Sequence, residues 1–165
     1  MRISASSLLP VAEGGATSKT SIRGARPGDL GAMVELLHLL FSIEADFNFD
    51  ADRQRRGLQM MLDRDDAVIL VAENKNRVIG MCTGQLTIST AEGGPALLVE
   101  DVVVAEVWQG LGVGRQLMSA LVHWAMDRKL RRLQLLADRN NAAALEFYKT
   151  LGWQPTELIC LRKRM

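Results

Sequence analysis

Three glycines stand at alternate positions directly after an apolar run, in the segment Gln109-Gly110-Leu111-Gly112-Val113-Gly114. Glycine lets the backbone approach a ligand closely, and the N–H groups at the start of a following helix point outward. The helix dipole adds about half a positive charge at that end. This glycine segment therefore suits a phosphate or pyrophosphate group.

Two other phosphate-binding motifs do not fit the glycine segment. A Walker loop ends in Gly-Lys-Ser/Thr, whereas Arg115 and Gln116 follow Gly114 here. A dinucleotide fingerprint would need its third glycine at Arg115, and it would open an early strand–helix–strand unit. A glycine turn kept only for tight packing remains the structural alternative.

A pair of carboxylates, Glu100 and Asp101, lies in the middle of the apolar run 97–104. A carboxylate in a site can act as a general base. Alternation along a strand predicts that the two side chains point to opposite faces of a sheet, so only one of them faces a reacting centre. The structural alternative is that one or both pair with an arginine or stabilise a distortion of the strand.

The elements that position these residues follow from hydrophobic periodicity and turn signals. We expect strands at 21–26, 67–72, 78–89, 97–104, 133–137 and 156–161, and helices at 30–41 (capped by Asp29), near 58–62, after the glycine segment and at 141–151. Strands first, followed by alternating strands and helices, predict an α/β fold in which helices flank a mixed sheet.

Length and composition limit the possible functions. The chain has 165 residues, enough for one domain, and 20 Lys and Arg against 19 Asp and Glu leave a net charge of +1. This balance gives no electrostatic footprint for nucleic acid or an anionic membrane, and no apolar run reaches the roughly 18 residues of a membrane span.

Cys82 and Cys160 form no CxxC pattern, so we expect no metal, no disulfide framework and a reduced, cytoplasmic location. Residues 1–19 predict a disordered extension, which leaves 20–165 as the domain.

Two blocks of the sequence resemble a known family. The Gln-x-x-Gly-x-Gly pattern of the glycine segment, directly after an apolar strand, resembles the acyl-CoA pyrophosphate loop of the GNAT superfamily of N-acetyltransferases. The segment 141–153 is similar to that superfamily's Asn-x-x-Ala…Tyr…Gly-Phe block, with Trp153 in place of the phenylalanine. The resemblance covers 20–163 and implies a GNAT-like fold with acetyl-CoA as co-substrate. Gln109 departs from it, because arginine is commoner there, and only one expected strand follows Gly152, where many relatives have a closing hairpin.

The resemblance also implies roles for single residues. The segment 98–104 is most similar to spermidine/spermine acetyltransferases, in which the residue matching Glu100 is assigned as the base; Asp101 would hold the substrate or a neighbouring element. Tyr148, the one tyrosine of the chain, stands where the family has its general acid, although tyrosine is also common at helix–sheet boundaries. The residues implied to contact acyl-CoA are Val102, Val103, Val104, Gln109, Gly110, Leu111, Gly112, Val113, Gly114, Arg115 and Asn141; for Asn141, a helix cap is the structural alternative.

These residue types agree with the chemistry of acetyl transfer. Attack on a thioester requires a neutral amine, and holding an alkyl ammonium of pKa about 10.4 deprotonated at pH 7 costs about 4–5 kcal/mol. A carboxylate base takes up that proton, and a tyrosine hydroxyl, with a pKa of about 10, can protonate the leaving thiolate.

The expected acceptor is a small cationic amine. Acidic and aromatic residues alternate in a stretch that lacks lysine and arginine between positions 27 and 52: Phe41, Glu44, Asp46, Phe47, Phe49, Asp50 and Asp52. Such a stretch attracts a cation, whereas a solvated surface is the structural alternative. The sequence thus predicts an enzyme that moves an acetyl group from acetyl-CoA to a primary amine by direct attack. The alternatives are a protein or peptide N-acetyltransferase and a non-catalytic acyl-CoA-binding sensor. A homodimer is expected if a partner completes the short sheet edge.

Overall fold

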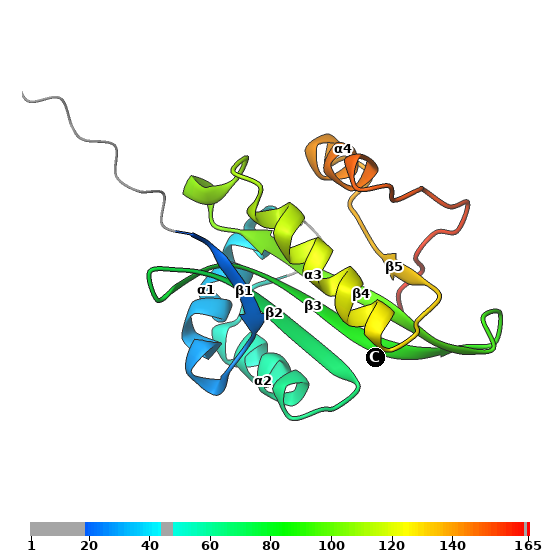
Figure 1. Ribbon diagram of the computed structural model, residues 1–165, viewed down its shortest axis with the longest axis horizontal. Helices are drawn as coiled ribbons and strands as arrows, with labels where there is room; N and C mark the ends of the chain where they lie inside the picture. The colour runs from blue at the N-terminus through cyan, green and yellow to red at the C-terminus, as the bar shows by residue number, and fades with distance from the viewer. Residues whose placement is uncertain (1–18, 44–47, 164) are drawn as a thin grey trace, which may run out of the picture.

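The computed structural model describes residues 19–43, 48–163 and 165, arranged around a five-stranded sheet (Figure 1). The strands lie in chain order; neighbours pair antiparallel except β4 and β5, which are parallel. The strands are β1 Ser21–Gly24, β2 Ala67–Asn74, β3 Arg77–Ser89, β4 Gly94–Val104 and β5 Leu133–Leu135; the helices are α1 Leu30–Ile43, α2 Ala51–Leu62, α3 Val113–Asp127 and α4 Ala142–Thr150, with short 3-10 helices η1 Pro27–Asp29 and η2 Glu106–Trp108. The predicted α/β fold, a mixed sheet flanked by helices, is confirmed.

Helices cover both faces of this sheet (Figure 1). α1 and α2 pack on one face through a core that includes Met33, Leu37 and Met81. α3 packs on the opposite face through Leu117 and Leu121, and α4 joins the same side beyond the β5 edge. The sheet therefore has its apolar side chains covered on both faces, as the nearly continuous apolar run of β2 requires.

Charged residues join the start of the helical layer to the sheet. Arg23 Nη1 donates to Asp29 Oδ2 at 2.7 Å, and Arg23 Nε donates to Glu73 Oε2 at 3.0 Å. Asp29 Oδ2 also accepts the backbone N–H of Arg26 at 2.7 Å. The prediction that Asp29 caps the first turn of α1 is wrong, because its carboxylate closes the preceding turn and binds Arg23. Hydrogen bonding to the Arg23 guanidinium lowers the pKa of Asp29.

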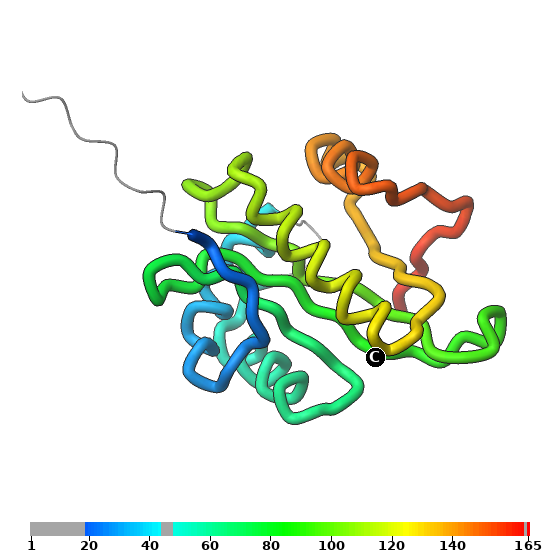
Figure 2. The backbone as a smooth tube through the Cα atoms, in the orientation of Figure 1, coloured from blue at the N-terminus to red at the C-terminus, as the bar shows by residue number. Residues whose placement is uncertain are grey.

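β4 and β5 stay paired over a short distance. Pairing runs from Leu97 with Leu133 to Val99 with Leu135. Beyond these pairs β4 continues to Val104, whereas the chain after β5 turns toward α4, as the backbone trace in Figure 2 shows. The cavity described below opens between these diverging segments.

The sheet ends at β5, and the expected strand at 156–161 is not formed. Leu158, Ile159 and Leu161 in this segment are 86%, 68% and 86% exposed. The edge strand β5 has three residues, so it offers few backbone N–H and C=O groups with which a further strand could pair.

Residues 1–18 lie outside the described part of the chain, so the extension at 1–19 and the domain boundary at residue 20 stay predictions. Within the described residues, no helix combines the length and apolar character needed to cross a bilayer.

Candidate active site

β4 carries a β-bulge where the two adjacent carboxylates lie. Met81 of β3 pairs with Val103, and Thr83 pairs with Glu100, so β4 has one more residue than β3 over this stretch. Asp101 lies in this bulge and has a left-handed backbone conformation, with a φ of +50°. This left-handed conformation costs about 1–2 kcal/mol for a residue with a Cβ atom.

The bulge places both carboxylates on one face of the sheet. Thr83 Oγ1 donates to Asp101 Oδ2 at 3.1 Å, and Gln85 Nε2 donates to Glu100 Oε2 at 3.1 Å. Thr83 and Gln85 are two residues apart on β3, so they share a face, which is the face of Met81 that α1 covers. The prediction that Glu100 and Asp101 point to opposite faces is therefore wrong, because the extra residue cancels the alternation between them.

After the bulge, alternate residues of β4 direct their backbone groups toward β3 and away from it. Ala105 N donates to Ile79 O at 2.9 Å. Because pairing alternates along an antiparallel strand, the N–H and C=O groups of Val102 and Val104 point to the side that β5 has left. Gln109 Nε2 donates to Val104 O at 2.9 Å there. The edge suits an extended ligand that pairs like another strand.

The glycine segment leads from η2 into α3 through two left-handed residues, Gly110 with a φ of +74° and Gly112 with a φ of +82°. The first helical hydrogen bond runs from Gln116 N to Gly112 O, so the amides of the first turn point out of the helix end. Gly114 differs, because a Cβ atom there would lie 3.2 Å from Phe147 Cζ. The tight-packing interpretation thus applies to Gly114, whereas Gly110 and Gly112 shape the helix end.

α4 brings Tyr148 to the same region. Asn141 Oδ1 accepts the N–H of Ala144 at 3.0 Å and caps the helix, as its structural alternative predicted. The Tyr148 ring centroid lies 5.3 Å from that of Phe147 and 6.2 Å from that of Trp153. These rings hold Tyr148 at the boundary between helix and sheet, half-buried and facing the cavity.

These parts border one cavity of about 540 Å³ between α1, β4, the glycine segment and α4. Three carboxylates line it, those of Glu100, Asp101 and Asp138, and none of its described lining residues is a lysine, arginine or histidine. α1 supplies an apolar wall of Leu39, Leu40 and Ile43. A negative wall beside apolar surface favours a ligand that carries positive charge.

A sequence model described as the acetyltransferase (GNAT) family matches residues 33–153. The chain belongs to the GNAT family. It is accordingly an acetyltransferase, and acetyl-CoA is its co-substrate.

This GNAT acetyltransferase is similar in sequence to other named acetyltransferases, over most of its length in one case and over a third of it in another. It is 28% identical over 146 residues to aminoglycoside N(6')-acetyltransferase type 1 from Stenotrophomonas maltophilia, a match that covers 86% of this chain and 91% of that protein. It is 45% identical over 56 residues to mycothiol acetyltransferase from Tsukamurella paurometabola, which is 34% of this chain and 19% of that protein. The narrower resemblance to spermidine/spermine acetyltransferases stays a prediction.

A solved structure shares the fold of this GNAT chain. AAC(6')-Iy in complex with the bisubstrate analogue CoA-S-monomethyl-acetylneamine matches with a TM-score of 0.77 and 21% identity, over 90% of this chain and 100% of that one. The GNAT-like fold predicted from the sequence is thus confirmed.

The cavity of this GNAT enzyme brings together most of the predicted site residues. Those that line it are Glu100, Asp101, Val102, Val103, Val104, Gln109, Gly110, Gly114, Asn141 and Tyr148. Four predicted residues are not among its lining residues: Leu111, Gly112, Val113 and Arg115. Val113 is 2% exposed and belongs to the core. Arg115 is exposed, and its Nη2 lies 3.5 Å from Thr150 Oγ1.

The prediction missed several lining residues of the GNAT cavity. Trp108 and Phe147 stand directly beside Gln109 and Tyr148 in the sequence, so adjacency to the two matched blocks was an available signal. Asp138 follows β5 by three positions, in the segment 136–141, which is also similar to the spermidine/spermine acetyltransferases, so that resemblance was an available signal. Asp138 reaches the cavity because the chain turns there, with Asp138 Oδ1 accepting Asn140 N at 2.8 Å.

The described residues of the acidic and aromatic stretch predicted to bind the acceptor, Phe41, Phe49, Asp50 and Asp52, are not among the lining residues of the GNAT cavity. Asp50 caps α2 by accepting Arg53 N at 3.0 Å, and Phe49 stacks on His38 with ring centroids 4.4 Å apart. Asp52 is exposed on α2, and Phe41 packs against the core between α1 and the sheet. Glu44, Asp46 and Phe47 lie outside the described residues. Of the described residues, Asp50 and Asp52 agree with the solvated-surface alternative, whereas Phe41 and Phe49 pack against the core.

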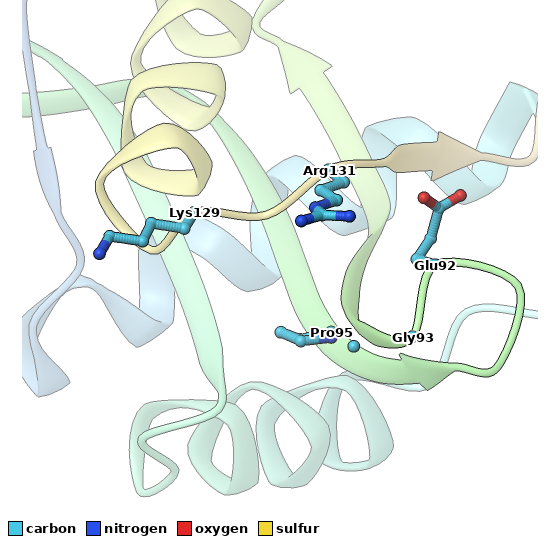
Figure 3. A pocket seen from close by; sticks show the side chains of 6 residues that line it. Glu92, Gly93, Pro95, Lys129 and Arg131 are labelled. Carbon is cyan, nitrogen blue, oxygen red and sulfur yellow. The ribbon is translucent and has the colours of Figure 1, made fainter.

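A second, smaller hollow of about 170 Å³ lies at the other end of β4 in this GNAT fold (Figure 3). Glu92 borders it from the turn between β3 and β4, and Lys129 and Arg131 border it from the segment between α3 and β5. Both signs of charge meet there, and the hollow shares no residue with the larger cavity. Among the described residues, no cluster of histidine, cysteine and acidic side chains could hold a metal ion.

Proposed function

We propose that this enzyme transfers the acetyl group of acetyl-CoA to a primary amine of a small acceptor with more than one positive charge. The observation that carries the proposal is the composition of the cavity wall, in which the described lining residues include three carboxylates, those of Glu100, Asp101 and Asp138, and no lysine, arginine or histidine. A polycationic amine gains favourable electrostatic energy in such surroundings. The match to an aminoglycoside N(6')-acetyltransferase supports an amine acceptor.

Acetyl-CoA lies along β4 in this proposal and reaches the start of α3. Its pantetheine arm pairs with the backbone of Val102 and Val104. Val104 O can accept a further hydrogen bond beside that from Gln109, because a carbonyl oxygen has two lone pairs. The pyrophosphate binds at the N-terminus of α3, where the outward amides and the helix dipole favour an anion. Arg115, exposed in the first turn, adds positive charge next to it.

The proposed reaction needs one base and one acid. Glu100 takes a proton from the acceptor ammonium, directly or through water. The neutral nitrogen attacks the thioester carbonyl carbon, so that a C–N bond forms and the C–S bond breaks. Tyr148 gives its hydroxyl proton to the leaving thiolate, and the second proton of the attacking nitrogen then restores Tyr148.

The two remaining carboxylates bind and orient in this scheme. Asp138, at the exposed rim, attracts a second ammonium of the acceptor. Asp101 adds negative charge to the cavity and holds β3 through Thr83. These assignments explain why the cavity would favour a polycation over an amine with a single charge.

The first test is thiol release from acetyl-CoA across polyamines, aminoglycosides, amino acids and short peptides. We expect turnover with an acceptor that carries several charges. Tyr148→Phe is expected to lower kcat by about a hundredfold or more with that acceptor, because general acid catalysis is lost. The control is the Kd for acetyl-CoA, which should not change, because the phenyl ring still fills the cavity wall.

Other outcomes of this panel would redirect the assignment. Turnover restricted to peptides would favour a protein or peptide N-acetyltransferase. Binding of acetyl-CoA without turnover on any amine would favour a non-catalytic acyl-CoA sensor. Full activity of the Tyr148→Phe enzyme would remove Tyr148 from the mechanism.

The proposal includes a homodimer and a cytoplasmic location, both of which stay predictions. The short edge strand β5 and the exposed apolar side chains of Leu158, Ile159 and Leu161 support assembly, because a second copy would cover them.

A further inference from the structure

Two polar side chains of β3 lie beside the bulge of β4. Thr83 is fully buried at 0% exposure, and Gln85 is half-buried. Both project from the face that carries Met81, which is apolar and packs under α1. A buried hydroxyl needs a hydrogen-bond partner, and a buried apolar side chain would fill the same space without one. The presence of a threonine at position 83 is therefore explained by the group to which its hydroxyl donates.

Each of these side chains donates to a different carboxylate. The Thr83 hydroxyl donates to Asp101 Oδ2 and the Gln85 amide donates to Glu100 Oε2, both at 3.1 Å. An ionised carboxylate only accepts hydrogen bonds, which sets the direction of both contacts. One strand thus binds both carboxylates of the bulge, at positions two residues apart.

The two hydrogen bonds have different consequences. The bond to Asp101 holds a residue whose φ is +50°, and that backbone angle sets which way Val102 and Val104 point. The bond to Oε2 of Glu100 leaves Oε1 as the oxygen that can take a proton from an acceptor.

We propose that Thr83 and Gln85 are positioning residues for acetyl transfer, Thr83 acting through Asp101 and Gln85 acting through Glu100. This inference rests on the proposed function, because that function makes Glu100 the base. Neither residue touches the reacting atoms. They hold the groups that do.

Other ionisable groups surround the two carboxylates. Tyr148 comes from α4 and Asp138 from the segment after β5, whereas the described α1 residues that line the cavity are apolar. Cys82 lies on β3, in the core rather than on the cavity wall. Burial, and to a lesser extent Asp101, raise the pKa of the Cys82 thiol to about 12, so Cys82 stays protonated at neutral pH.

The test uses acetylation kinetics of the full chain. Thr83→Val removes the hydroxyl at nearly constant volume, and Gln85→Met removes the amide at similar length. We expect each variant to lower kcat by about tenfold while the Kd for acetyl-CoA stays unchanged, because each removes the donor that orients one carboxylate. Thr83→Ser should restore kcat, because it keeps the hydroxyl that donates to Asp101.

Thr87→Val is the matched control. Thr87 lies on the same face of β3, away from the bulge, and its Oγ1 is 3.5 Å from Ala96 O. The loss of this hydroxyl should leave kcat unchanged. Gln85 is half-buried, so Gln85→Met keeps the test open if Thr83→Val fails to fold.

The split between kcat and KM completes the test. KM for the acceptor should stay nearly unchanged in both variants, because neither residue contacts the acceptor. An unchanged kcat in both variants would overturn the inference. A wild-type protein that binds acetyl-CoA but acetylates no amine would instead overturn the proposed function.

Discussion

The backbone of Asp101 decides how the side chains around it are used. Of the two residues beside it, Glu100 has a longer side chain and Val102 is β-branched. A β-branched residue adopts the left-handed region poorly, whereas a short polar side chain such as that of aspartate tolerates it and bonds locally. The strained residue is thus the one whose carboxylate finds a buried donor in Thr83. As a result, Glu100 and Asp101 share one cavity wall.

A prediction at the residue scale concerns Asp138. Asp138→Asn keeps an oxygen that can accept the Asn140 N–H, so the turn after β5 should persist while one charge is lost. We expect KM for a polycationic acceptor to rise by about fivefold, as for the loss of an exposed ion pair, with kcat unchanged. Steady-state kinetics at low ionic strength would measure this.

The control for this substitution is Asp127→Asn, which removes the same charge from the exposed end of α3. It should leave KM unchanged. Equal effects of the two variants would mean that net charge matters and the position of Asp138 does not.

At the scale of elements, Arg23 connects β1 to η1 and β2 through its two carboxylate partners. Its side chain is 20% exposed and that of Asp29 is 12% exposed, so the pair is shielded from much of the solvent. Because η1 leads directly into α1, this contact fixes where the helix that walls the cavity begins. A local charge contact thereby supports the apolar wall of the site.

A prediction at this scale is a stability change that depends on pH. Asp29 has a lowered pKa in the folded state, so its contribution is present at neutral pH and is lost as the pH falls below its ordinary value of about 4. Asp29→Asn should lower the free energy of unfolding by about 1–2 kcal/mol at pH 7, and by less at pH 3. Urea unfolding at both values would measure it.

Asp66→Asn is the control for Asp29. Asp66 also pairs with an arginine, Arg64, but their side chains are 47% and 57% exposed. Its loss should change stability little at either pH, because water screens an exposed pair. A decrease for Asp29→Asn that is as large at pH 3 as at pH 7 would contradict the role of its charge.

At the scale of the whole molecule, the cavity exists because β4 and β5 separate after three residue pairs. The two helical layers meet the cavity from opposite faces of the sheet, with α1 on one side and α4 on the other (Figure 1). The same short pairing makes β5 the edge of the sheet, and the described residues 156–163 add no further strand to it.

A prediction at this scale tests the expected homodimer. Replacing Leu158 and Leu161 together by glutamate should give a monomer in sedimentation equilibrium, because charge would be buried against the second copy. Met60→Glu, at a position 66% exposed on α2, should leave the oligomeric state unchanged. A wild-type monomer at micromolar concentration would contradict the expectation.

The features that depend on local sequence pattern could be predicted without the structure. Periodicity predicted the helices and most strands, and the glycine segment and the block around Tyr148 identified the GNAT family. Glycine at 110 and 112 and asparagine at 141 act through their own backbone or the next turn, so their structural roles could be inferred without knowing what lies opposite.

Strand pairing, register and the bulge could be seen only in the tertiary structure. The bulge at Asp101 depends on a donor that stands 18 positions earlier, on β3, and the place of Asp138 depends on where β5 stops. The segment 156–161 has a strand-like sequence but no strand beside it long enough to pair with. Register and pairing depend on contacts between residues distant in the chain, and alternation within one strand does not contain that information.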